Sequence, residues 1–284
     1  MKSFLKYLLA TIVGVIITGA IFFFILVASI SSMVSQQDEP LELKSNTILK
    51  VELNKVIADR SPKNPFEGFS FTSLKPSKTL GLNQILANIE KAKKDDNIKG
   101  IYLNLSSIPA GIATIEEIRN ALIDFKESEK FILCYSDNYN QRSYYLGSVA
   151  DKIYMNPAGR IYMNGLSSQI MFFKEALDKL GVEPQIIRHG KFKSAIEPFT
   201  KNKMSPENRE QIDVYMNSLW DHMAKGISES RNISLDKLNE ITNNLTLRTS
   251  EAAIKHNLID ELKYKDQILD ELKDKSEIDK KNTL

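Results

Sequence analysis

Residues 99–125 read KGIYLNLSSIPAGIATIEEIRNALIDF, and this stretch decides the fold. Residues 99–105 form a short apolar run that predicts a strand. Residues 106–111 contain a proline and a glycine and predict a loop. Isoleucine, leucine and phenylalanine then recur at helical spacing. Thr114 with Glu117 three residues later matches a capping box, so we expect a helix that begins near Thr114.

The same order of strand, loop and helix continues on both sides of this stretch. We expect further strands at residues 47–53, 130–135, 152–155 and 185–188, a loop at residues 58–78, and helices at residues 82–94, 141–150, 174–180, 205–229, 234–239 and 250–256. Residues 160–163 and 168–172 should form an extended pair around the turn Asn164-Gly165, and residues 258–272 should close the fold. Ser205 and Pro206 suit the N-cap and first position of the long helix. Strands that alternate with helices indicate an α/β fold with parallel strands.

The composition excludes several functional classes. The chain has 284 residues, of which 38 are basic and 36 acidic, and its formal net charge of +2 is too small for a nucleic-acid-binding surface. The single Cys134 excludes an intrachain disulfide and a zinc cluster built on cysteines. The three histidines lie far apart, and neither a phosphate-binding loop nor a dinucleotide-binding glycine motif occurs. We therefore expect no cofactor, no metal and no nucleic-acid partner.

The N-terminus predicts a membrane anchor. Between Lys6 and Asp38 no residue is charged, and residues 7–27 are rich in Leu, Ile, Val and Phe. About 20 apolar residues are enough to cross the hydrocarbon core, whereas a cleavable signal peptide has a shorter apolar centre. Because Lys2 and Lys6 precede the span, the N-terminus should stay in the cytoplasm. We expect a cytoplasmic N-terminus at residues 1–6, a transmembrane signal anchor at residues 7–28 and a juxtamembrane linker at residues 29–45.

Residues 188–199, RHGKFKSAIEPF, combine basic and apolar side chains. Lys191 and Lys193 lie two residues apart after a glycine, so in an extended chain both would point to one side. A basic run inside a folded domain is most often a solvated face. However, a lysine among phenylalanine, alanine and isoleucine can lose its proton, because desolvation disfavours the ammonium form. The residues alone leave both interpretations open.

Three other features could carry chemistry. The loop at residues 105–111 precedes a helix, and its amides could stabilise an oxyanion, although an ordinary connecting loop is the favoured interpretation. Residues 139–148 contain three tyrosines that could line a peptide groove, although packing in the core is favoured. Ser143 and Ser148 in this segment lack the small neighbours that free the backbone of a nucleophile. A triad with His189 is disfavoured, because no serine lies in a GxSxG turn.

Several stretches together resemble one family. They are residues 103–122 (LNLSSIPAGIATIEEIRNAL), 144–154 (YYLGSVADKIY), 190–199 (GKFKSAIEPF) and 204–210 (MSPENRE), and they follow the predicted anchor in matching order. From about residue 46 to residue 272, the chain resembles the N-terminal half of the long, two-domain form of the signal peptide peptidase SppA family, also called protease IV.

The resemblance implies a ClpP/crotonase-like α/β domain at residues 46–272, followed by a charged tail at residues 273–284. It also implies a serine peptidase that uses a Ser-Lys dyad to degrade cleaved signal peptides. Such a peptidase is a homo-oligomer in the bacterial inner membrane, single-pass, with its main domain on the periplasmic side. By resemblance the general base falls on Lys193, which directly precedes Ser-Ala-Ile-Glu-Pro, and not on Lys191.

The sequence departs from the complete enzyme at the nucleophile. In the long form the serine lies in a second, homologous domain, in a segment similar to Ala-Ser-Gly-Gly. The corresponding residues 140–145 read NQRSYY and contain no glycine. We therefore expect the chain to supply the lysine base and to need a serine-bearing C-terminal domain or partner chain. The alternative is a non-catalytic module that binds peptides or assembles a membrane protease complex. An acyl-CoA enzyme on the same fold is disfavoured, because CoA is not available outside the cytoplasm.

Overall fold

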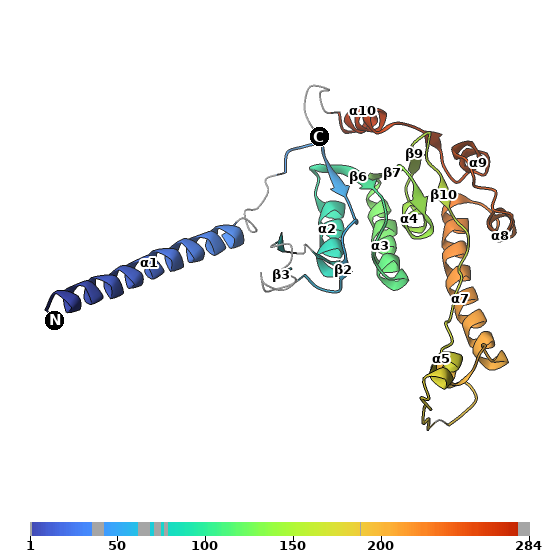
Figure 1. The fold of residues 1–284 in the computed structure, drawn as a ribbon. Helices are drawn as coiled ribbons and strands as arrows, with labels where there is room; N and C mark the ends of the chain where they lie inside the picture. The colour runs from blue at the N-terminus through green and yellow to red at the C-terminus, as the bar shows by residue number, and fades with distance from the viewer. Residues whose placement is uncertain are drawn as a thin grey trace. The chain divides into compact units, whose positions relative to one another are not determined.

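A computed structural model describes residues 2–35, 43–61, 69–70, 75–76, 79–187 and 189–277 (Figure 1). The chain divides into two compact units. One comprises Met1–Lys44 with Pro62–Ser77, and the other comprises Ser45–Ser61 with Lys78–Leu284. The first contains the N-terminal helix, and the second contains the α/β fold.

The first unit consists of a long apolar helix and a short pair of antiparallel strands. The helix α1 spans Lys2–Ser35, and its part Ser3–Ala28 is long and apolar enough to cross a membrane. The helix includes the anchor predicted at residues 7–28 and continues into the first residues of the predicted linker. The strands are β3 (Phe69–Ser70) and β4 (Lys75–Pro76). The rest of the loop predicted at residues 58–78 lies largely outside the described residues.

The second unit is built on a five-stranded sheet. Its strands are β1 (Thr47–Val51), β6 (Ile98–Asn104), β7 (Phe131–Ser136), β9 (Lys152–Met155) and β11 (Glu261–Leu262), in the order β1-β6-β7-β9-β11. Each neighbouring pair is parallel. The predicted α/β fold with parallel strands is therefore confirmed, as are the strands expected at residues 47–53, 99–105, 130–135 and 152–155.

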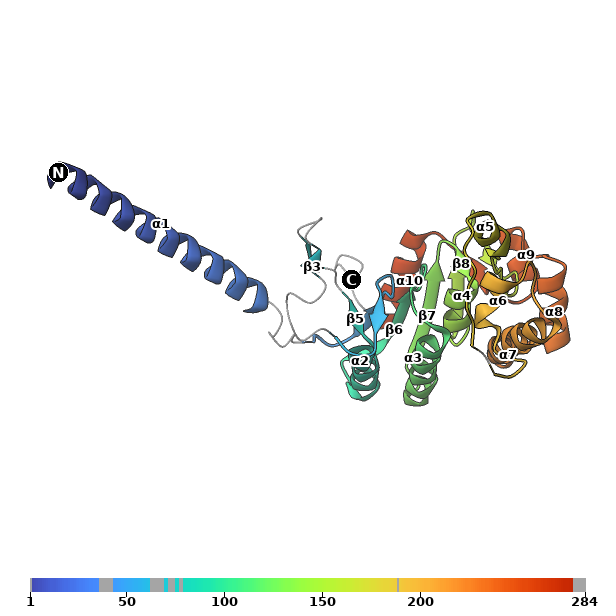
Figure 2. The ribbon, with the colours of Figure 1, turned by 60° about the horizontal axis from the view of Figure 1, so that its bottom comes forward.

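Helices cover both faces of this sheet. One face is covered by α2 (Leu82–Lys94), α3 (Ile112–Phe125) and α4 (Gln141–Gly147), and the other by α10 (Lys265–Ser276) (Figure 2). Ile268 and Leu272 of α10 pack against Tyr102, Leu133 and Tyr154 of the sheet. Burial on both faces explains why β6 is apolar along most of its length rather than strictly alternating.

Shorter elements complete the unit. Two parallel pairs are formed by β2 (Ile57–Ala58) with β5 (Leu80–Gly81), and by β8 (Tyr139–Asn140) with β10 (Ile161–Tyr162). The helices outside the sheet layers are η1 (Lys126–Ser128), α7 (Pro206–Arg231), α8 (Leu235–Asn243) and α9 (Ser250–Lys255). The predicted start of the long helix is confirmed, because the Ser205 side chain accepts a hydrogen bond from the Asn208 amide and Pro206 follows the cap.

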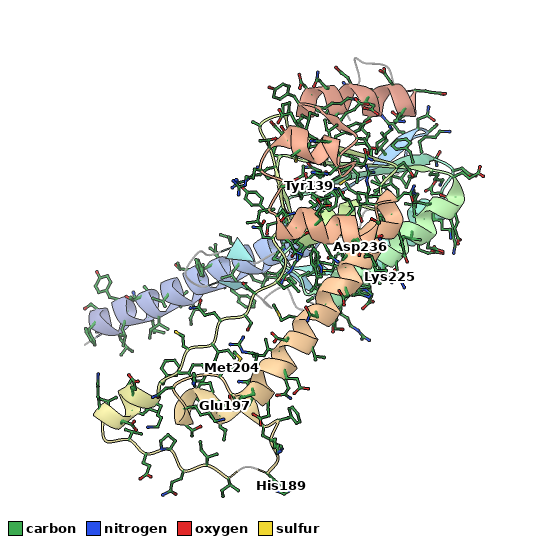
Figure 3. All side chains as sticks on the ribbon, turned by 90° about the vertical axis from the view of Figure 1, so that its right-hand side faces the viewer. Tyr139, His189, Glu197, Met204, Lys225 and Asp236 are labelled. Atoms are coloured by element: carbon green, nitrogen blue, oxygen red, sulfur yellow. The ribbon has the colours of Figure 1, made fainter. Side chains whose placement is uncertain are left out.

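Between β10 and α7 the chain forms a projecting segment, residues 164–205, which we call the arm. It contains α5 (Lys174–Lys179), η2 (Ser194–Ile196) and α6 (Glu197–Thr200). The arm lies at the N-terminal end of α7, away from the sheet (Figures 1 and 3). Its large apolar side chains include an exposed set: Met171, Phe173, Leu180, Val182, Ile187, Phe192 and Phe199. An apolar surface left open in this way is typical of an interface.

The strand expected at residues 160–163 is confirmed as β10, but its pairing with residues 168–172 and the strand expected from residue 185 are wrong. Residues 160–163 and 168–172 do not pair across Asn164-Gly165, since β10 pairs with β8 instead. Gly165 has a φ of +77°, but its amide donates to Gln141 Oε1 (3.1 Å), so α4 holds the turn rather than a returning strand. Residues 185–187 form no strand either, and Ile187 is fully exposed with no sheet edge beside it; Arg188 lies outside the described residues.

The capping box predicted at Thr114 and Glu117 is also wrong. The helix α3 begins at Ile112, and its N-cap is Gly111, which has extended backbone angles and no side chain to cap with. Thr114 therefore already lies inside the first turn. The closing segment predicted at residues 258–272 contains the two-residue strand β11, followed by α10. A strand of two residues is too short to produce a recognisable alternation of apolar and polar side chains in the sequence.

Arg119 joins α3 to the C-terminal half of α7. Its buried Nη2 donates to the backbone oxygen of Gly226 (2.8 Å) and to Ser230 Oγ (2.6 Å). The guanidinium carbon lies 4.8 Å from the centre of the Tyr145 ring. A Cβ at Gly226 would lie 2.7 Å from Tyr145 Cε2, so only glycine lets α7 approach this closely. One end of α7 is thus held by a buried cation, and the other end carries the arm.

Candidate functional site

Lys193 lies in the arm, at the beginning of a tight turn. Gly190 has a φ of +95°, residues 190–192 form a bend and a turn, and Lys193 is the N-cap of η2. The chain is not extended at Lys191 and Lys193, because the backbone is left-handed at Gly190 and the 3₁₀ turn follows directly. The alternation of side chains along an extended strand therefore does not apply here, and it gives no reason for the Lys191 and Lys193 side chains to point in the same direction.

Of the two interpretations left open for Lys193, the described residues agree with the exposed one. The Lys193 side chain is exposed, and so are Phe192 (52%) and Phe199 (46%), whereas Ile196 is half-buried. A lysine is desolvated only where other atoms replace the water around its ammonium group. Any desolvation of Lys193 therefore has to come from a further surface that covers the arm.

Glu197, four residues after Lys193, is buried, with only 1% of its side chain exposed. Its Oε1 accepts from Lys201 Nζ (2.9 Å) and from Ser205 Oγ, and its Oε2 accepts from the Ser205 amide (3.1 Å) and from Asn208 Nδ2 (3.0 Å). The carboxylate thus connects the turn after Lys193 to the first residues of α7. Sequence reasoning interpreted Ser205 only as a helix cap. It missed this contact because Glu197 and Ser205 meet only when the chain folds back.

Burial by itself raises the pKa of Glu197, because it disfavours the charged carboxylate. The hydrogen bonds from Ser205, Lys201 and Asn208 outweigh burial and lower the pKa from 4.5 to about 2. A folded-state pKa below the unfolded one means that the contribution to stability is complete above pH 4.5. It is lost as the pH falls from 4.5 to about 2.

We expect the turn after Lys193 to loosen over this acid range. Pepsin is active there, and its cleavage at the exposed Phe199 should accelerate between pH 4.5 and pH 2, relative to cleavage of an unstructured reference peptide. The Glu197→Gln variant has no carboxylate to titrate at this position and should lack the acceleration. An identical pH dependence in both proteins would contradict the role of Glu197.

Further contacts brace the same turn from the side of α5. The Phe173 amide donates to the Pro198 backbone oxygen (2.7 Å), and the Phe173 and Phe199 rings stack with centres 6.2 Å apart. On the side of α7, Ser194 Oγ donates to Gln211 Oε1 (3.2 Å). The turn that carries Lys193 is therefore held between the beginning of α5 and the beginning of α7.

The two serines considered in residues 139–148 are engaged in local hydrogen bonds. The buried Ser143 hydroxyl accepts from the Asn140 amide (3.0 Å) and donates to the Asn140 carbonyl (3.1 Å), and the buried Ser148 hydroxyl donates to the Tyr145 carbonyl (2.8 Å). Tyr139, Tyr144 and Tyr145 are also buried. The core interpretation of this segment is confirmed, and the peptide-groove interpretation is wrong.

This segment also lies far from the lysine turn. Tyr139 appears at one end of α7, whereas Glu197 and His189 appear at the other (Figure 3). A helix of 26 residues measures about 40 Å from end to end. His189 is exposed, and among the described residues no hydrogen bond joins it to a serine or a carboxylate. The structure therefore brings Glu197, Ser205 and Asn208 together but brings neither Ser143 nor Ser148 to Lys193.

The loop at residues 105–111 leads directly into α3. The Ala110 amide is already bonded to the Ile108 carbonyl (2.9 Å), and the Ala110 carbonyl accepts from Arg142 Nη1 (3.3 Å). Gly111 is open to solvent on the side where a Cβ would lie, since no heavy atom comes within 4 Å of that position. The amide and carbonyl of Ala110 therefore already have hydrogen-bond partners within the chain, as in an ordinary connecting loop.

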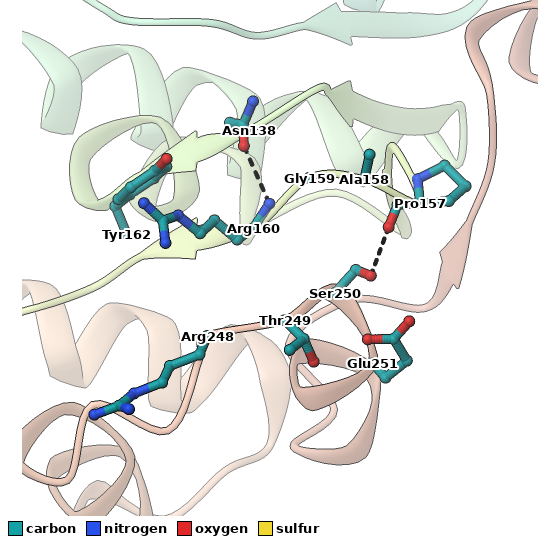
Figure 4. A pocket seen from close by; sticks show the side chains of 10 residues that line it. All are labelled: Asn138, Pro157, Ala158, Gly159, Arg160, Tyr162, Arg248, Thr249, Ser250 and Glu251. Atoms are coloured by element: carbon teal, nitrogen blue, oxygen red, sulfur yellow. Dashed lines mark hydrogen bonds between the residues drawn. The ribbon is translucent and has the colours of Figure 1, made fainter.

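A surface pocket of about 440 Å³ lies beyond the carboxyl ends of β7 and β9 (Figure 4). Asn138, Arg160 and Tyr162 line one side of it, and Arg248 and Ser250 line the other. The Arg160 guanidinium stacks on Tyr162 (4.2 Å), and Ser250 Oγ donates to the Pro157 carbonyl (2.7 Å). None of the residues singled out from the sequence lines this pocket, so it is not the lysine site. Within the described ranges, no group of three or more His, Cys, Asp or Glu residues is placed to hold a metal ion.

Residues 124–279, more than half of the chain, match the family described as Peptidase family S49. The chain belongs to peptidase family S49. S49 is a family of serine peptidases in the ClpP/crotonase-like clan, so the predicted fold class is confirmed.

Curated S49 relatives carry names that agree with the resemblance seen in the sequence. The chain is 34% identical to Protease 4 of Haemophilus influenzae over 221 residues, which cover 76% of this chain and 36% of that protein. It is 35% identical to Protease 4 of Salmonella typhi over 189 residues, 64% of this chain and 31% of that protein. It is 29% identical to the chloroplastic serine protease SPPA of Arabidopsis thaliana over 205 residues, 72% of this chain and 30% of that protein. The chain spans about a third of the length of these relatives.

Proposed function

We propose that this chain is the lysine-bearing part of a membrane-anchored serine peptidase that degrades cleaved signal peptides with a Ser-Lys dyad. Lys193 is the general base. The nucleophilic serine comes from a second, serine-bearing half, which is either a C-terminal domain of the same polypeptide or a partner chain. The assembled peptidase is a homo-oligomer.

The observation that carries the proposal is the setting of Lys193. It opens a turn that is braced by a buried carboxylate, on an arm whose large apolar side chains are exposed. A surface that packs on the arm would bury Phe192 and Phe199 and would remove water from the lysine between them. On this proposal Lys193 becomes an effective base only when a second surface covers it. This agrees with the observation that Ser143 and Ser148 of this chain donate their hydroxyl hydrogen bonds to backbone carbonyls of their own helix segment.

The names of relatives support the substrate class. Two are called Protease 4, and a relative from Enterococcus faecium, 22% identical over 230 residues, is called a putative signal peptide peptidase SppA. The long apolar helix near the N-terminus supports the membrane location. With Lys2 and Lys6 before this helix, the orientation that we propose puts the N-terminus in the cytoplasm and residues 46–272, the peptidase domain, on the periplasmic side of the inner membrane.

The chemistry assigned to Lys193 is proton transfer. Its neutral amine takes the hydroxyl proton of the serine while the serine oxygen bonds to the peptide carbonyl carbon. The ammonium group then gives this proton to the departing amine nitrogen as the C–N bond breaks, which leaves an acyl-enzyme. Lys193 next takes a proton from water while the water oxygen bonds to the ester carbonyl carbon. The ammonium group then returns this proton to the serine oxygen as the ester C–O bond breaks, which releases the acyl product and restores the serine and the neutral amine.

We expect the isolated chain to be inactive and the combined protein to be active. The chain in detergent should not hydrolyse a fluorogenic apolar peptide above background, and co-expression with a serine-bearing half should produce activity that a serine-directed phosphonofluoridate abolishes. The control is the same half with its serine changed to alanine. Full activity of the isolated chain would overturn the proposal. A complex that assembles and binds peptide without turnover would instead identify a non-catalytic binding module.

A further inference from the structure

Among the described residues, the turn that carries Lys193 has one buried side chain, Glu197, that bonds to the beginning of α7. Its other side-chain hydrogen bond to α7, from Ser194 to Gln211, is exposed to solvent, where water competes with it. Glu197 is 1% exposed, and its hydrogen bonds are shielded. Of the contacts that reach from this turn to α7, the Glu197 carboxylate is therefore the one that resists opening.

The partners of Glu197 call for a group that only accepts hydrogen bonds. The Lys201 ammonium, the Ser205 amide and the Asn208 side-chain amide can only donate in this geometry, and the Ser205 hydroxyl donates as well. An ionised carboxylate has the acceptor sites for all four, with two donors on each oxygen. Lys201 is the charged group that faces it, and its head group is partly exposed.

Lys193 and Glu197 belong to one continuous turn. Lys193 is the N-cap of η2, η2 runs through Ile196, and α6 begins at Glu197. In such a turn the backbone angles of four successive residues fix the direction of the first side chain relative to the last. Holding Glu197 against Ser205 and Asn208 therefore also sets where the Lys193 backbone lies and in which direction its side chain leaves the arm.

We propose that Glu197 is the positioning residue of the peptidase, which fastens the Lys193 turn to the beginning of α7 so that the amine meets the serine of the second half. The inference rests on the proposed function, because it assigns Glu197 to the base. It adds a residue that touches neither substrate nor serine and acts only through Lys193. Ser205 has two roles in this arrangement, since its hydroxyl also caps α7 at the Asn208 amide (3.2 Å).

The first experiment measures the order of the turn in the full chain, without any requirement for activity. Trypsin cleavage at the Lys193–Ser194 bond should be about tenfold faster in Glu197→Ala than in the unchanged chain, because the buried bonds that oppose local opening are gone. Glu197→Gln keeps an acceptor oxygen for the Ser205 amide and Asn208 but places its NH2 group, a donor, against the Lys201 ammonium, so it should give an intermediate rate. Asp213→Ala, an exposed carboxylate on α7, is the matched control and should leave the rate unchanged.

The second experiment measures kcat and KM in the complex with the serine-bearing half, normalised to the amount of complex recovered by size exclusion. Glu197→Ala should lower kcat about 100-fold with KM nearly unchanged, since misplacing a catalytic group affects the chemical step. Glu197→Gln should recover most of the loss. A purely structural role would instead reduce the yield of complex and leave kcat of the recovered complex intact.

The two readouts separate the inference from the proposed function. If the unchanged complex hydrolyses peptide and Glu197→Ala retains its kcat within about twofold, the positioning role is overturned while the peptidase function stands. An unchanged cleavage rate at Lys193 in Glu197→Ala would overturn the role as well. If Glu197→Ala is cleaved faster by trypsin at Lys193 but the complex without substitutions has no activity, the proposed function is wrong. Glu197 then has only a structural role, which is to hold the turn against α7.

Discussion

Replacing Lys193 with alanine should lower kcat of the complex with the serine-bearing half by at least about 1,000-fold, because the serine then has no group to take its proton. Lys193→Arg should be equally inactive, although it keeps the positive charge, because arginine stays protonated and cannot act as a base. The measurement is hydrolysis of the fluorogenic peptide by complexes that are matched for the amount of both halves.

Lys191→Ala is the matched control for this result. Lys191 lies two residues earlier on the same exposed bend and should be dispensable, with kcat within about threefold of the unchanged complex. Co-purification of the two halves should be the same for all three variants. Robust hydrolysis by the Lys193→Ala complex would contradict the assignment of the base, and equal losses at both lysines would point to charge rather than proton transfer.

Replacing Arg119 with alanine should lower the free energy of unfolding of the α/β unit by about 3 kcal/mol, since two hydrogen bonds from a buried cation and its packing on Tyr145 are lost together. The single Trp220 on α7 reports this loss without interference from α1. Its indole nitrogen donates to Asn239 Oδ1 (2.9 Å), so its fluorescence follows the packing of α7 on α8. Urea titration of the full chain in detergent measures the change.

The exposed Arg209 on α7 is the control for Arg119. Arg209→Ala removes the same guanidinium from the same helix at a position open to solvent and should change the unfolding free energy by less than about 0.5 kcal/mol. Equal stability of the two variants would show that the buried contacts of Arg119 do not hold α7. Because α7 carries the arm, a loose α7 should also reduce the yield of complex with the second half.

The four strands recognised from the sequence were predictable because their signals are local. Ile101 and Leu103 are buried on one side of β6, and Tyr102 is buried on the other, so a single apolar run sufficed to identify a buried strand. The helix start at Ser205 was equally local, since a cap and a proline act within a few residues. The strand pairs were not local. β10 pairs with β8, about twenty residues earlier in the chain, and a two-residue strand carries no signal for such a distant partner.

For the site, too, some features could be predicted from local sequence and others could not. A resemblance of short motifs was enough to select Lys193, but the residues alone left open whether it lies on a solvated face or among apolar side chains, and the structure shows it exposed. Phe192 and Phe199 are both exposed, and the contact of Phe199 with the Phe173 ring stays within the arm. Sequence neighbours share a pocket only if the chain folds over them, and here the chain turns away.

The parallel α/β fold, the apolar N-terminal helix and the family could be predicted from the chain, because each depends on periodicity, composition or motifs within a few dozen residues. The folded structure was needed to show that Lys193 is exposed on an arm, that Glu197 is buried, and that Ser205 and Asn208 hold it. The physical reason is that burial and hydrogen-bond partners are properties of residues that meet in space. Glu197 and the start of α7 are brought together by the fold of the intervening chain.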